Sequence, residues 1–245
     1  MQILNDYKNI LSNGIVIKSS GTSGTAKEYF QSPEKLSAAN KIAIDVQKIL
    51  PSSRIYTCCK INHAGGLLAQ TLPALSIGAQ VDLVDFNPYN FIRSIHNYTH
   101  THITPKYAKA IMRTKSFQYI NFSNLHITCG ADPVTWDIIE AFVSRGATFT
   151  ANWGMSEIGP IAINVTFNSL DDVARIRLNS DDTCTILGDS FYCDYKIENN
   201  ELLVRGDICI YNDWYKTNDT VISKNGMLYY TGRKNILVDL WNPTK

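Results

Sequence analysis

The chain has 245 residues, of which 44% are hydrophobic, and a formal net charge of +1. This length and apolar content suffice for a sizeable core, while the charge balance argues against a nucleic-acid or acidic-membrane partner. No apolar run approaches the roughly 20 residues of a membrane span, and the N-terminus lacks the features of a secretory signal, which together predict a soluble, cytoplasmic protein.

The first 160 residues alternate helical patterns with short apolar runs. Ser32 is a suitable N-cap and Pro33 fits the first helical position, so the pattern predicts a helix over residues 32–50. Further helices are expected at 65–79, bent by Pro73, at 88–97, from Pro105, and from Asp132 with Pro133. Strands are expected at 54–59, 80–85, 101–104, 125–130 and 147–151.

This order of elements predicts an α/β fold with a mostly parallel sheet flanked by helices. Ligands of such sheets bind at the C-terminal ends of the strands. Residues 128–132 and 151–159 lie at or just past the ends of predicted strands, so both are candidate site loops.

The pattern changes after residue 160. Short β-rich runs such as 161–167, 201–211 and 226–232 are separated by polar turns. They predict a smaller antiparallel β subdomain, sheet or barrel-like. We therefore expect two parts, residues 1–160 and 161–245, which pack together.

Six cysteines and a histidine cluster are the candidates for metal or disulfide sites. No two cysteines form a C-x-x-C pair, and buried free thiols of a reducing compartment are the favoured interpretation. His96, His100 and His102 lack a Cys or carboxylate that completes a ligand set, so ordinary histidines are favoured over a metal site.

The segment "SSGTSGTAKEYF" (19–30) is the most distinctive part of the chain. Its glycines indicate a turn or a close approach of the backbone to a ligand. Its hydroxyls, backbone amides and the Lys27 ammonium are groups that a polyphosphate needs. A Ser/Gly-rich hairpin turn without a ligand is the alternative.

Several separated segments resemble, in order, the adenylate-forming (AMP-binding) enzymes of the acyl- and aryl-CoA synthetase type. "VIKSSGTSGTAK" resembles their phosphate loop, "CGADPV" the turn that frames the adenine, and "NWGMSEIGP" their aromatic-Gly-Met-Thr-Glu motif. "DWYKTNDTVISKNGMLYYTGRKN" resembles their Tyr-Arg-Thr-Gly-Asp and Gly-Arg elements, and "INHAGGLLAQTLPALSIGAQVDL" the segment that lines the acyl pocket.

The resemblance implies a role for each matching residue. Lys27 and Glu157 would be catalytic, with Glu157 holding Mg²⁺ on the phosphate oxygens of ATP. Asp219 and Arg233 would bind the ribose, and Trp153 would stack on adenine. The other implied nucleotide-binding residues are Ser20, Gly21, Thr22, Ser23, Gly24, Thr25, Gly130, Ala131, Asp132, Gly154, Met155 and Ser156, while His63, Gly65 and Gly66 would line the pocket for a small carboxylic acid.

Each single match also has an ordinary explanation. Trp153 fits a core aromatic, Glu157 a solvated loop charge, Asp219 a turn former and Arg233 a strand cap. The chain also departs from the family pattern, with Trp153 for tyrosine, Ser156 for threonine, Lys216 for arginine and Asn218 for glycine, and with Glu28 after the loop lysine. The ordered set of matches favours the site.

The resemblance further implies a minimal core. Family members carry a subdomain before the phosphate loop and a mobile domain after the hinge, a position that Asn235 occupies here. We therefore expect either an acyl-AMP-forming enzyme, with CoA-thioester formation doubtful, or a non-catalytic binder of adenine nucleotides. Apolar surface on residues 65–75 and 161–167 is expected to be bare and to favour a homodimer or a partner chain.

Overall fold

The computed structural model describes residues 2–18, 27–178 and 184–234. Ser20, Gly21, Thr22, Ser23, Gly24, Thr25 and Asn235, all named from the sequence, lie outside these residues. The helices are α1 (Gln2–Asn13), α2 (Pro33–Gln47), α3 (Ala64–Gly66), η1 (Leu67–Thr71), α4 (Leu72–Ser76), α5 (Pro88–Ser94), η2 (Ile95–Asn97), α6 (Pro105–Met112), η3 (Phe117–Tyr119), α7 (Trp136–Val143) and α8 (Leu170–Arg177).

A seven-stranded sheet forms the centre of the molecule, in the order β10-β8-β7-β6-β5-β3-β4. Its strands are β3 (Arg54–Thr57), β4 (Gln80–Leu83), β5 (His100–Ile103), β6 (His126–Cys129), β7 (Thr148–Met155), β8 (Gly159–Phe167) and β10 (Ser190–Phe191). The five strands from β4 to β7 run parallel, while β8 and β10 are antiparallel to their neighbours. The predicted α/β fold with a mostly parallel sheet is confirmed.

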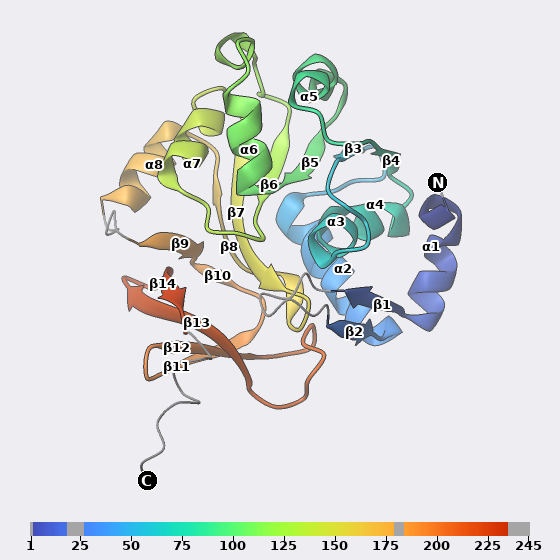
Figure 1. The fold of residues 1–245 in the computed structure, drawn as a ribbon, viewed down its shortest axis with the longest axis vertical. Coiled ribbons are helices and arrows are strands. Elements are labelled where there is room, and N and C mark those ends of the chain that lie inside the picture. Colours follow the sequence, from blue (N-terminus) through green and yellow to red (C-terminus); the bar gives the residue numbers. More distant parts are fainter. Residues whose placement is uncertain (1, 19–26, 179–183, 235–245) are drawn as a thin grey trace.

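Two smaller antiparallel sheets complete the fold (Figure 1). One is the hairpin of β1 (Ile15–Lys18) and β2 (Glu28–Gln31). The other is five-stranded, in the order β11-β12-β13-β14-β9. Its strands are β9 (Thr185–Gly188), β11 (Asp194–Glu198), β12 (Glu201–Arg205), β13 (Tyr215–Lys224) and β14 (Met227–Arg233), so the predicted antiparallel second sheet is also confirmed.

The two faces of the central sheet differ in chemistry because side chains alternate along each strand. Ile127 and Cys129 of β6 belong to the largest apolar cluster, with residues of α5, α6, α7 and α8. On the opposite face, the buried Gln47 side chain of α2 accepts a hydrogen bond from the Thr128 hydroxyl at 2.8 Å. It also accepts from the Gln70 amide at 2.7 Å, so buried hydrogen bonds join α2, η1 and the sheet.

Four sequence-based expectations need correction. Residues 161–167 form most of β8, which belongs to the seven-stranded sheet and not to the second one. The helix expected from Asp132 starts at Trp136, with Thr135 in the N-cap position and Asp132 exposed before it. Strand β7 runs on to Met155 because β8 pairs with it. Helix α8 was not expected at all. The division of the chain at residue 160 remains a prediction, and it would fall inside strand β8 of the β7–β8 hairpin.

The apolar segments that were expected to be bare are buried in this chain. Leu67, Leu68 and Leu72 pack in a cluster with Ile10 of α1 and Ile17 of β1. Figure 1 shows α1 (dark blue) running alongside α4 at one edge of the molecule. Ile161 and Ile163 of β8 are likewise 1% and 0% exposed. The prediction that these segments expose apolar surface is therefore wrong, and it no longer gives a reason to expect a homodimer or a partner chain.

The bend expected at Pro73 takes the form of a π-helical turn. η1 closes with an i→i−5 hydrogen bond from the Leu72 amide to the Leu67 carbonyl, and Pro73 follows in the first turn of α4. Proline has no backbone N–H to donate, and its ring clashes with the preceding turn of an α-helix. A wider π-helical turn before Pro73 accommodates both effects without ending the helix.

Two buried histidines, His100 of β5 and His126 of β6, lie opposite each other in the sheet. His126 donates to or accepts from the Thr150 hydroxyl at 2.8 Å, and its ring stacks on that of His100 at 5.6 Å. Burial, and then the neighbouring His100, lower the pKa of His126 to about 3. Burial lowers the pKa of His100 as well.

We expect the free energy of unfolding to fall as the pH drops below about 6.5, because the unfolded chain then binds protons that the folded His126 does not. Between pH 7.5 and pH 5, His126 alone should account for a loss of about 2 kcal/mol. Urea titrations at the two pH values measure it. His126→Asn removes the titrating ring and should reduce the difference; an unchanged difference would contradict this assignment.

Candidate functional site

The first group of predicted site residues meets between β7 and the end of the second sheet. The indole Nε1 of Trp153, on β7, donates to Asp219 Oδ2 at 3.0 Å. Asp219 lies on β13 directly opposite Arg233 of β14, whose Nε is 3.6 Å from Oδ1. Three residues from separate predicted motifs, up to 80 positions apart, are thus in contact.

Asp219 is 5% exposed, and the burial raises the pKa of its carboxyl group. The Trp153 hydrogen bond and the Arg233 charge act in the opposite direction and favour the ionised form. Each carboxylate oxygen offers about two acceptor sites, so the two described contacts leave acceptor capacity unused. A further hydrogen-bond donor can therefore bind this carboxylate.

The residue before Asp219 explains one departure from the family pattern. Asn218 has a φ of 61°, in the left-handed region where glycine is the usual residue. Asparagine adopts this conformation more readily than other non-glycine residues. The substitution is therefore compatible with the backbone that presents Asp219.

Glu157 lies in the turn between β7 and β8, which is held by two side-chain contacts and by the Ile210 amide, which donates to the Glu157 carbonyl at 2.9 Å. The Tyr215 hydroxyl donates to Glu157 Oε1 at 3.2 Å. The Gln31 side chain donates to the carbonyl of Ser156 at 2.8 Å, which ties the turn to β2. Burial and the Glu157 charge both raise the pKa of Tyr215, so its hydroxyl keeps the proton that it donates. Glu157 itself is partly exposed.

Neither Gln31 nor Tyr215 was named as a site residue from the sequence. Gln31 is the last residue of β2 and is 2% exposed. The sequence of this strand contains no motif that indicates a functional contact. Tyr215 lies inside the quoted "DWYKTND" stretch, four residues before Asp219. The signal that could have found Tyr215 was its place in a matched motif.

Lys27 is exposed and directly precedes β2. The strands on either side of residues 19–26 are paired, with Lys18 opposite Glu28 and an ion pair of 3.0 Å between their side chains. The hairpin thus brings both ends of the glycine-rich segment together at one point. Gln31, at the far end of the same strand, contacts the Glu157 turn.

Several predicted glycines have structural explanations. A Cβ on Gly130 would lie 2.5 Å from the carbonyl oxygen of Asn152 on the neighbouring strand β7. A Cβ on Gly154 would lie 2.5 Å from the carbonyl oxygens of Gly159 and Pro160, across the β7–β8 hairpin. Ala131 has a φ of 76°. Close backbone packing therefore accounts for Gly130 and Gly154, whether or not a ligand binds beside them.

The residues expected to line the acid pocket form a separate group beside β1. His63 Nδ1 is 3.1 Å from the Lys18 carbonyl, the last described position before the glycine-rich segment. A Cβ on Gly65 would lie 3.2 Å from the His102 ring, and one on Gly66 would lie 2.0 Å from the Lys60 carbonyl oxygen. Of the predicted pocket residues, Gly66 is thus required by packing.

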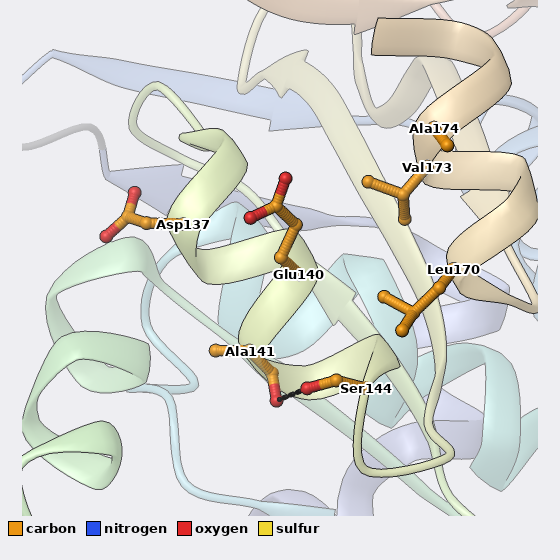
Figure 2. A pocket seen from close by; sticks show the side chains of 7 residues that line it. All are labelled: Asp137, Glu140, Ala141, Ser144, Leu170, Val173 and Ala174. Carbon is orange, nitrogen blue, oxygen red and sulfur yellow. Dashed lines mark hydrogen bonds between the residues drawn. The ribbon is translucent and has the colours of Figure 1, made fainter.

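A surface hollow of about 530 Å³ lies elsewhere, between α7 and α8 (Figure 2). It is lined by Asp137, Glu140, Ala141, Ser144, Leu170, Val173 and Ala174, none of which was predicted as a site residue. Two carboxylates on its wall disfavour a phosphate group. We assign it no part in the candidate site.

The described residues contain neither a cluster of metal ligands nor a membrane-spanning helix. Within them, no three His, Cys, Asp or Glu side chains are grouped as metal ligands, and none of the six cysteines forms a disulfide. No helix in the described ranges is long and apolar enough to cross a membrane.

Comparison with known proteins relates this arrangement to a family. The chain is 27% identical to the indoleacetate–CoA ligase of Aromatoleum aromaticum, in an alignment that covers 91% of this chain and 48% of the ligase. Its fold matches the O-succinylbenzoate coenzyme A synthetase (MenE) of Bacillus subtilis in complex with ATP and a magnesium ion, at a TM-score of 0.74 and 19% identity. That match covers 89% of this chain and 49% of the synthetase.

A second solved structure, ATP-bound MatB from Rhodopseudomonas palustris, matches with a TM-score of 0.70 and 14% identity, over 89% of this chain and 47% of MatB. The chain thus spans about half the length of these relatives. The family model described as AMP-binding enzyme matches residues 15–213, which include every predicted site residue except Asp219 and Arg233. The chain therefore belongs to the AMP-binding enzyme family.

Proposed function

We propose that the chain binds ATP with Mg²⁺ and transfers AMP to a small carboxylic acid, which gives acyl-AMP and releases pyrophosphate. The contact of Trp153, Asp219 and Arg233 is the observation that carries the proposal. Family membership and the relative named as a ligase support the reaction type. The proposed reaction ends at acyl-AMP.

In this proposal Asp219 accepts hydrogen bonds from the ribose hydroxyls of the nucleotide, and Arg233 donates a further one. The unused acceptor capacity of the buried carboxylate supports this role. Trp153 is proposed as the aromatic neighbour of adenine, with its indole oriented by the Asp219 contact. Residues 130–132 and 154–156 are proposed to line the nucleotide from the adjacent strand ends.

Glu157 fits a magnesium ligand by its chemistry. Mg²⁺ prefers carboxylate oxygens and phosphate oxygens, and when bound it would offset the negative charge of the phosphates. Tyr215 donates to Oε1 of Glu157, so this carboxylate would keep acceptor capacity for the ion. Lys27 and the glycine-rich segment are proposed to hold the β- and γ-phosphates. His63 and Gly65 are proposed to border the acid.

The test is pyrophosphate release by the purified chain with ATP, Mg²⁺ and a panel of small aliphatic and aromatic acids. An acid-dependent release, with the matching acyl-AMP detected by mass spectrometry, would support the proposal. Nucleotide binding without release for any acid would support the alternative, a module that binds adenine nucleotides without adenylation. The Trp153–Asp219–Arg233 contact is consistent with that alternative too, because it concerns only the nucleoside.

We propose a cytoplasmic location, because none of the six cysteines forms a disulfide, as is usual for proteins of a reducing compartment.

Lys27→Ala should weaken ATP binding much more than AMP binding, because the ammonium is proposed to contact only the β- and γ-phosphates. Loss of one charge-assisted contact corresponds to roughly a tenfold to hundredfold higher Kd for ATP. Isothermal titration calorimetry with both nucleotides measures the ratio. Lys41→Ala, at an exposed position of α2, is the matched control. Equal losses for ATP and AMP would contradict the phosphate role.

A further inference from the structure

The turn that carries Glu157 is fixed by donors from outside the β7–β8 hairpin. The Gln31 amide, from β2, donates to the carbonyl of Ser156 at 2.8 Å. The backbone amide of Ile210, between β12 and β13, donates to the Glu157 carbonyl at 2.9 Å. The Tyr215 hydroxyl, from β13, donates to Glu157 Oε1 at 3.2 Å. Both the main chain and the carboxylate of Glu157 are thus held by separate parts of the fold.

Gln31 is a polar residue on the buried face of its strand. Tyr29 and Gln31 are buried, whereas Glu28 and Phe30 between and before them are exposed. Burial of an amide costs free energy unless it is hydrogen-bonded, and an apolar side chain would fill the same space without that cost. The bond to the Ser156 carbonyl offsets the cost. The contact with the Glu157 turn therefore explains why a glutamine stands here.

Tyr215 is held in place by an aromatic neighbour. Its ring stacks on that of Tyr211, with 5.2 Å between the ring centroids and 6° between the planes. Ile210, which supplies the backbone donor to Glu157, directly precedes Tyr211. The segment 210–215 thus brings two donors to one residue, and the stack restricts the ring that carries the second donor.

We propose that Gln31 and Tyr215 are positioning residues that orient the Glu157 carboxylate for Mg²⁺ and so determine how much the ion strengthens ATP binding. The inference rests on the proposed function, in which Glu157 is a magnesium ligand. Gln31 acts through the backbone of Ser156, and Tyr215 acts through the carboxylate itself. Lys27 directly precedes the strand of Gln31, so this strand joins the proposed phosphate contact to the Glu157 turn.

Isothermal titration calorimetry of the full chain with ATP, once in EDTA and once in excess Mg²⁺, tests the proposal. The ratio of the two Kd values is the gain in affinity from the ion. Gln31→Met keeps an unbranched side chain without the donor, and Tyr215→Phe keeps the ring without the hydroxyl. Each should lower the gain roughly tenfold, as is typical when a partner that orients a metal ligand is lost. The Kd for ATP in EDTA should stay close to the wild-type value.

Thr114→Val is the matched control, because it removes a hydrogen bond from a 7% exposed side chain to the Ile111 carbonyl after α6, outside the candidate site. Its gain should equal that of the wild type. A purely structural role of Gln31 and Tyr215 would change both Kd values alike and leave the gain unaltered, which would overturn the inference. Circular dichroism shows which variants fold, and Tyr215→Phe, at a partly exposed position, decides if Gln31→Met does not.

The wild-type titrations separate this inference from the proposed function. ATP binding that Mg²⁺ does not strengthen would overturn the inference, while acid-dependent pyrophosphate release could still support the adenylation reaction. Absence of ATP binding would overturn both. A wild-type gain that both variants retain would overturn the positioning role alone.

Discussion

Asp219→Ala should raise the Kd for ATP, ADP and AMP by the same factor, roughly 100-fold or more. The ribose is common to the three nucleotides, so the proposed contact is lost from each alike. Hydrogen bonds to a charged group contribute about 1.5–3 kcal/mol apiece, and two of them would be removed. Calorimetric titration of the three nucleotides against the wild type and the variant measures the effect.

The control variants separate binding from folding. Asp213→Ala removes an exposed carboxylate six residues earlier in the chain and should leave all three affinities unchanged. Asp219→Asn keeps the shape and tests the charge, because an amide offers only one oxygen to accept hydrogen bonds. Thermal unfolding of Asp219→Ala measures how much stability the protein loses together with the Trp153 and Arg233 contacts. A folded variant with wild-type affinity would remove Asp219 from the site.

The sequence predicted the order of strands and helices well because local signals coincided with tertiary packing. Ser32 caps α2 by accepting from the Lys35 amide, and Asn87 and Thr104 cap α5 and α6 before their prolines. In each of these helices a hydroxyl or amide side chain precedes a proline, so the start is marked twice. Such starts can be located without knowing what the helix packs against.

The misplaced start of α7 arose where two cap signals compete. Asp132 and Thr135 both precede a helical pattern, and Pro133 supports the earlier one. In the structure Val134 is 3% exposed and belongs to the largest apolar cluster, before the helix begins at Trp136. Packing of this residue outside the helix is a tertiary effect, and the sequence pattern does not contain it.

Strand pairing explains the remaining errors. Residues 152–155 were expected to be a loop, yet they pair with β8, and Gly154 permits the close approach. Helix α8 was missed although Ser169 accepts from the Asp172 amide and Val173 and Ile176 are buried. The segments on both sides of it are β-rich, so the short helical pattern of residues 170–177 was not recognised. The contact of Trp153 with Asp219 joins β7 of the seven-stranded sheet to β13 of the second sheet, so only the family resemblance suggested it.

Gly66→Ala should destabilise the fold far more than Gly65→Ala, although both residues were predicted from the same motif. A Cβ on Gly66 would lie 2.0 Å from the Lys60 carbonyl oxygen and 2.5 Å from its carbonyl carbon, so the backbone of residues 59–60 would have to move. Overpacking of this kind costs about 3 kcal/mol. The corresponding drop in Tm is roughly 6–12 °C for a chain of this size.

The adjacent glycine is the matched control for that prediction. A Cβ on Gly65 would meet only the His102 ring, at 3.2 Å, and a side chain can shift by the few tenths of an ångström required. Gly65→Ala should therefore cost less than about 1 kcal/mol. Differential scanning calorimetry of the two variants against the wild type measures the difference. An equally small loss of Tm in both variants would mean that the backbone at Lys60 moves to make room for the new methyl group. Packing would then not explain Gly66, and a bound ligand would be the remaining explanation for its small size.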